Sequence, residues 1–198
     1  FYAICDAVNG GNAANAVPQY FNNGMTSKTA VLWDESHDTY KDNGTKDISS
    51  QNINKTWAIV GSRNEVCGMY LARPSDINTT MMGDADQTSW ASRAVKAVNK
   101  FKNHFRGEEE YMSSYNSLAC VERGDSGMVI VNTGGTYYNG MSAPVHIMAS
   151  GTYTDAITGN TFTVSDGYIS GDIGDTGIAV VYDVENSGVF STGNVTEL

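Results

Sequence analysis

The chain has 198 residues, enough for one domain with a substantial core or for two small domains. Its 22 acidic and 12 basic side chains give a formal charge of −10 at pH 7. That charge disfavours nucleic acids and anionic membranes as partners, because both attract basic surfaces. The acidic charge instead suits a protein that acts on an uncharged ligand. No apolar run has the length needed to cross a bilayer.

Three cysteines, Cys5, Cys67 and Cys120, are widely separated in the sequence. Their spacing fits no zinc motif, and their odd number cannot complete a set of disulfides within the chain. We therefore expect three buried free thiols.

The first half of the chain alternates helical and strand-like patterns. Helical patterns at 1–8 and at 12–22, the second interrupted by Pro18, precede a predicted strand at 28–33. Because the chain opens directly on a helical pattern at Phe1, we expect it to begin inside a larger structure.

A helix and a second strand follow in the same half. Ser49 or Ser50 is a suitable N-cap for a helix that carries Ile53, Trp57 and Val60 on one face. The near-continuous apolar run at 66–72 is typical of a buried parallel strand. An apolar stripe with basic residues in its last turns then predicts a helix over 89–105.

From residue 111 onward the helical period disappears, and short apolar runs alternate with Gly- and Asp-containing turns. This pattern predicts an antiparallel β-sandwich of seven or eight strands. The strands are expected near 118–122, 128–132, 145–149, 152–154, 161–164, 168–170 and 178–182. The predicted fold class is thus α/β followed by all-β, with domains at 1–110 and 111–184 and a Gly/Ser/Asn-rich tail at 185–198.

The pair His37-Asp38 follows shortly after the predicted strand at 28–33. Barrel enzymes present their catalytic groups at the carboxyl ends of strands, which makes this pair a candidate site. A carboxylate accepts hydrogen bonds and a neighbouring imidazole can donate one, which together suit the vicinal hydroxyls of a sugar. The alternatives are a loop Asp38 that caps a turn and a His37 that makes a structural hydrogen bond.

Several segments, in order, resemble the α-amylase family, and in particular secreted bacterial α-amylases. Residues 32–40 resemble the family's seventh-strand motif, which ends in His-Asp. The other segments that carry the resemblance are 57–63, 72–74, 83–84, 98–103, 121–124, 129–132, 151–155 and 177–182. Two positions depart from the pattern, Ser36 where many relatives have Asn and Asp34 where an apolar residue is expected.

The resemblance implies the last part of a (β/α)8 TIM barrel followed by a β-sandwich, within an enzyme that hydrolyses internal α-1,4 bonds of starch with retention. It implies that Asp38 is the third catalytic carboxylate, which stabilises the transition state, and that His37 binds the same sugar. The implied nucleophile and acid/base, which in a retaining enzyme lie about 5 Å apart, precede this chain in the family. The implied partners are therefore a starch or maltooligosaccharide substrate and the N-terminal barrel portion of the same enzyme.

Other residues near the motif have two interpretations. Tyr40 and Glu35 are candidate substrate-binding residues, while Glu35 could instead pair with a basic residue of the barrel, and the role of Arg73 is open. The acidic loop with Asp84 and Asp86 is better explained by solvated turns than by a metal site, since calcium needs six to eight converging oxygens.

The resemblance implies calcium as a candidate cofactor, with ligands outside this chain, and a secreted, extracellular location. A rival hypothesis is a non-catalytic carbohydrate-binding or self-assembling β-rich module derived from an amylase.

Overall fold

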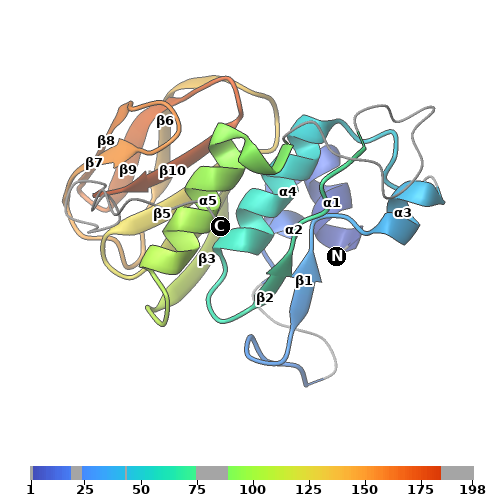
Figure 1. Cartoon of the computed structure of the whole chain (residues 1–198). Helices are drawn as coiled ribbons and strands as arrows, with labels where there is room; N and C mark the ends of the chain where they lie inside the picture. The colour runs from blue at the N-terminus through green and yellow to red at the C-terminus, as the bar shows by residue number, and fades with distance from the viewer. Residues whose placement is uncertain (1, 19–23, 43, 75–88, 184–198) are drawn as a thin grey trace, which may run out of the picture.

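A computed structural model describes residues 2–18, 24–42, 44–74 and 89–183 of the chain. Helices and a short parallel strand pair make up the first part, and a large antiparallel sheet makes up the second (Figure 1). The helices are α1 (Tyr2–Asn9), α2 (Ala13–Ala16), α3 (His37–Lys41), α4 (Ser50–Ser62), the 3-10 turn η1 (Ser89–Ala91) and α5 (Arg93–His104). Among the described residues, no helix combines the length and apolar character that a membrane span requires.

The first two strands, β1 (Val31–Trp33) and β2 (Cys67–Met69), run parallel, with Val31 opposite Cys67 and Trp33 opposite Met69. Helix α4 connects them, as the sequence predicts. Parallel neighbours need such a crossover because a tight turn can only join antiparallel strands. The prediction of a buried second strand is wrong, since Met69 is 57% exposed and Cys67 is an exposed thiol. Val31, on the same face, is also exposed, at 46%.

Both long helices begin at a serine whose hydroxyl satisfies a backbone amide. Ser49 accepts a hydrogen bond from Asn52 N at 3.2 Å, which decides between the two N-cap candidates of α4. Ser92 accepts one from Val95 N at 3.3 Å at the start of α5. These caps replace intrahelical partners that the first turn lacks.

Eight antiparallel strands form a single continuous sheet in the order β3-β4-β5-β10-β7-β8-β9-β6. Their bounds are β3 (Glu110–Tyr115), β4 (Leu118–Arg123), β5 (Gly127–Asn132), β6 (Tyr138–Pro144), β7 (Gly151–Asp155), β8 (Thr161–Ser165), β9 (Tyr168–Ile173) and β10 (Ile178–Tyr182). The predicted number and antiparallel direction are confirmed. The two separate sheets of a sandwich are not found, because β10 pairs with both β5 and β7 and joins the two halves.

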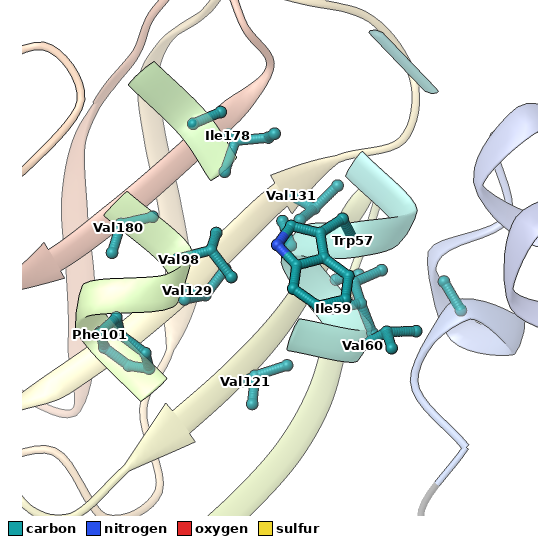
Figure 2. Packing of buried hydrophobic residues seen from close by; sticks show 14 of the residues in the cluster. Trp57, Ile59, Val60, Val98, Phe101, Val121, Val129, Val131, Ile178 and Val180 are labelled. Carbon is teal, nitrogen blue, oxygen red and sulfur yellow. The ribbon is translucent and has the colours of Figure 1, made fainter. Parts of the chain in front are cut away.

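Strands β4, β5 and β10 are buried on both faces and alternate between two hydrophobic clusters. One cluster lies on the side of these strands that faces away from α4 and α5, and it groups Met128 and Ile130 of β5 with Phe162 of β8. The second lies between the sheet and helices α4 and α5, whose side chains pack down onto the strands (Figure 2). It contains Trp57, Ile59, Val60, Val98, Phe101, Val121, Val129, Val131, Ile178 and Val180.

This second cluster is shared by the helical part and the sheet, so the sheet supports the elements that carry β1 and β2. The domain boundaries at 1–110 and 111–184 stay a prediction, and the tail at 185–198 lies outside the described residues.

Candidate functional site

The pair His37-Asp38 lies just after β1, in the first turn of α3. Both side chains reach into solvent, with exposed fractions of 70% and 74%, and His37 Nε2 is 3.2 Å from Asp38 Oδ1. The sequence therefore placed the pair correctly at the carboxyl end of a parallel strand. The structure places the pair in a short helix, because α3 begins at residue 37.

Ser36 explains the start of that helix. Its hydroxyl accepts a hydrogen bond from Thr39 N at 3.2 Å, while Thr39 Oγ1 accepts one from Ser36 N at 3.0 Å. This reciprocal arrangement is a capping box. The serine that departs from the amylase pattern thus has a local role, because it fixes where the backbone turns from β1 into α3.

An apolar recess of about 280 Å³ opens beside His37. Side chains at the ends of β1 and β2 line it, among them Trp33, Met69 and Leu71. An open apolar surface next to hydrogen-bonding groups suits the flat face and polar rim of a sugar ring.

Asp34, the other departure from the pattern, is fully buried between the strand ends. Its Oδ1 accepts hydrogen bonds from Glu35 N at 2.8 Å and Leu71 N at 3.1 Å. Burial raises the pKa of Asp34 to about 8, and the nearby charge of Glu35 acts in the same direction against those two hydrogen bonds. Asp34 thus ties the end of β1 to the segment that follows β2.

Glu35 and Tyr40, the other predicted substrate-binding residues, are 2% and 3% exposed. Glu35 forms a two-pronged ion pair with Arg73, at 2.6 Å from Nε to Oε2 and 2.8 Å from Nη2 to Oε1. The Arg73 guanidinium also lies 5.5 Å from the centre of the Tyr40 ring. The alternative of a Glu35 pair with a basic residue is the one observed, while a role of Glu35 and Tyr40 in substrate binding stays a prediction.

Sequence reasoning left Arg73 open and did not single out Thr45, yet both belong to this buried polar cluster. Thr45 donates a hydrogen bond through its hydroxyl to Glu35 and lies ten residues after it. Arg73 comes from the far side of α4. The available signal was a charged residue close behind each predicted strand, with Glu35 two residues after the first and Arg73 directly after the second.

Metal ligands are not gathered in the described part of the chain, where no three His, Cys, Asp or Glu side chains come together. The loop with Asp84 and Asp86 lies outside the described residues. Calcium, with ligands elsewhere, stays a prediction.

The sequence of the chain is similar to those of two bacterial α-amylases. It is 29% identical over 179 residues to an α-amylase of Clostridium acetobutylicum, covering 89% of this chain and 22% of that protein. It is 28% identical over 168 residues to an α-amylase of Butyrivibrio fibrisolvens, covering 76% and 17%. The chain therefore spans about a fifth of the length of these relatives. No family model matches it.

Solved structures show the same fold at low identity. An E249Q mutant of α-amylase I from Eisenia fetida, in complex with maltohexaose, superposes with a TM-score of 0.63 at 12% identity over 90% of this chain and 47% of that one. A γ-CGTase from alkalophilic Bacillus clarkii gives 0.63 at 14% identity over 92% and 31%. Sequence and fold together relate this chain to the α-amylases, and it matches a part of their length.

Proposed function

We propose that this chain is the C-terminal part of a retaining α-amylase and supplies its third carboxylate, Asp38. The observation that carries the proposal is the position of an exposed His37-Asp38 pair at the carboxyl end of a parallel strand, beside an open apolar recess. Barrel enzymes keep their active sites at that end of the strands. The names of the relatives supply the substrate class, starch and related α-glucans.

In this proposal the strands β1 and β2 are the last two of a (β/α)8 barrel. One face of the pair, with Val31 and Met69, is 46% and 57% exposed, and apolar sheet faces of this kind are normally covered. The preceding part of the same enzyme would cover the Val31 end of this face, leave the recess at the carboxyl ends of the strands open, and bring the nucleophile and the acid/base. The similarity to α-amylases is also the basis on which we propose an extracellular location.

The chemical role of Asp38 follows from charge. Glycoside hydrolysis passes through a transition state that resembles an oxocarbenium ion, so positive charge develops on the sugar as the bond breaks. A carboxylate held beside that sugar stabilises the transition state more than the neutral substrate. His37 would donate a hydrogen bond to a hydroxyl of the same sugar.

Kinetics of Asp38→Asn in the complete enzyme, on a soluble maltooligosaccharide, tests the proposal. The variant keeps the size of the side chain and removes its charge. We expect kcat to fall about a hundredfold or more, with a much smaller change in KM. Asp47→Asn is the matched control, because Asp47 is an exposed carboxylate of the same inter-strand segment and should tolerate the change.

Near-normal turnover of Asp38→Asn would contradict the proposal. A complete protein that binds glucans without hydrolysing them would support the rival role as a carbohydrate-binding module.

A further inference from the structure

The segment that carries His37 and Asp38 runs from Asp34 to Ile48, between β1 and α4. Within the described part of the chain, the polar contact that each of these two side chains makes is with the other. Their position therefore depends on the backbone of α3. Whatever holds the two ends of this segment holds the candidate site.

A single buried guanidinium, that of Arg73, binds both ends. At the start of the segment it pairs with Glu35 through two hydrogen bonds of 2.6 and 2.8 Å. At the other end, Arg73 Nη2 donates to Thr45 O at 2.8 Å and Nη1 donates to Ile48 O at 2.7 Å. The segment is thus closed into a loop whose two ends meet at one side chain.

Further contacts connect the middle of the loop to the same cluster. The Thr45 hydroxyl donates to Glu35, and Thr45 N donates to Thr39 O at 3.0 Å, which ties the end of the loop to α3 itself. The Tyr40 ring, two residues after Asp38 in α3, lies against the Arg73 guanidinium. We call Glu35, Arg73, Thr45 and Tyr40 the Arg73 clamp.

The geometry of the clamp favours orientation over stability as its role. The Glu35 and Arg73 side chains are 0% and 8% exposed, and a buried ion pair gains little net stability once the loss of hydration is counted. What the planar guanidinium provides is a fixed direction for each donor, which a lysine cannot reproduce. A displacement of about 1 Å at a catalytic group can lower a rate about a hundredfold.

We propose that Glu35 and Arg73 are positioning residues, which hold α3 so that Asp38 and His37 face the reacting sugar. This inference rests on the proposed function and deepens it, because it assigns to Glu35 a role through Asp38 in place of direct substrate contact.

The test is Arg73→Lys in the complete enzyme, with kinetics and hydrogen–deuterium exchange measured on the same samples. We expect kcat to fall at least tenfold with KM changed less than threefold, since the lysine keeps the charge and loses the fixed donor directions. Amide exchange should accelerate at Asp42, Thr45 and Ile48, whose amides bond within the loop, and not in α4.

Arg93→Lys is the matched control. Arg93 also pairs with a carboxylate, because its Nη2 lies 2.9 Å from each oxygen of Asp175, but the two side chains are 58% and 51% exposed. Its replacement should leave kcat and the exchange of residues 34–48 unchanged. Thr45→Val is a milder second variant, which removes the hydroxyl contact to Glu35 and keeps the backbone carbonyl that Arg73 binds. It tests the Arg73 clamp even if Arg73→Lys folds poorly. Its kcat should fall about threefold, with faster exchange in the same segment.

The outcomes separate the two proposals. If Asp38→Asn is inactive while Arg73→Lys and Thr45→Val accelerate exchange without lowering kcat, the positioning role is overturned and the proposed function stands. Unchanged exchange in both variants overturns the clamp itself. If Asp38→Asn is fully active, the proposed function fails, whatever the exchange data show.

Discussion

Arg123 on β4 donates a hydrogen bond from Nη1 to the carbonyl of Ser62, the last residue of α4, at 2.6 Å. Its Nη2 donates to the carbonyl of Phe105, the C-cap of α5, so one fully buried guanidinium binds the C-terminal ends of both long helices. Helix C-termini carry unsatisfied carbonyls and partial negative charge, which a cation stabilises. Arg123 therefore links the sheet to the helices that carry the parallel strands.

Arg123→Ala should lower the free energy of unfolding by about 3 kcal/mol or more, because it leaves buried carbonyls without donors and removes packed volume. Arg106→Ala is the control, since Arg106 is an exposed arginine close to the same helix ends, and should cost about 0.5 kcal/mol at most. Urea unfolding followed by circular dichroism measures both. Equal losses of unfolding free energy in the two variants would show that the Arg123 hydrogen bonds to the helix ends do not stabilise the fold.

Asp34→Asn should change how stability depends on pH. Burial raises the pKa of Asp34 from 3.8 to about 8, so between these pH values the folded chain binds more protons than the unfolded chain. The contribution of Asp34 therefore falls as pH rises from about 4 to about 8 and is level above that range. Asn cannot ionise, so urea titrations should show a flatter profile for Asp34→Asn, while exposed Asp47→Asn follows the wild type. Parallel profiles for all three proteins would refute a raised pKa.

The sequence predicted β4, β5 and β10 well because they are apolar on both faces and buried between two clusters. Strands β3 and β6 were missed. Both are edge strands of mixed polarity, and β6 contains Gly140 and Pro144 and a register shift. Such strands form because they pair with a neighbouring strand, and the local sequence pattern contains no signal for that pairing.

The strand predicted at 145–149 is wrong for an equally specific reason. The buried carboxylate of Glu122 accepts hydrogen bonds from the backbone amides of His146, Ile147 and Met148 at 2.8 to 3.1 Å. Those donors are therefore not available to a neighbouring strand. The expectation of three buried thiols fails only at Cys67, whose side of the β1–β2 pair is open.

The candidate site likewise combines local features, which the sequence predicts, with features that depend on contacts between distant residues, which it does not. The position of His37-Asp38 could be predicted because a strand end is a local feature of the sequence. The burial of Glu35 and Tyr40 could not, because it depends on Arg73, which lies beyond the intervening helix.

The open face of β1 and β2 predicts that the isolated chain associates with itself. Val31 and Met69 are exposed apolar residues on a strand pair whose edges have no further partner among the described strands. Light scattering at micromolar concentration should show species larger than a monomer, and Val31→Lys with Met69→Lys should reduce them. Replacing exposed Tyr137 and Tyr168 by Ser, on the sheet side, is the control and should change nothing. A stable wild-type monomer would argue that this face needs no cover.

The central claim is that the charge of Asp38 stabilises positive charge on the sugar. Its most direct test compares two ligands that the complete enzyme cannot hydrolyse: a neutral maltooligosaccharide with a thioether at the scissile linkage, and an analogue with a protonated amine there. Calorimetry on the wild type and Asp38→Asn measures both affinities without requiring turnover. We predict that the variant loses about a hundredfold in affinity for the cationic analogue and less than about threefold for the neutral ligand. Equal losses for the two ligands would contradict the account, because they would show that Asp38 does not distinguish the charged state.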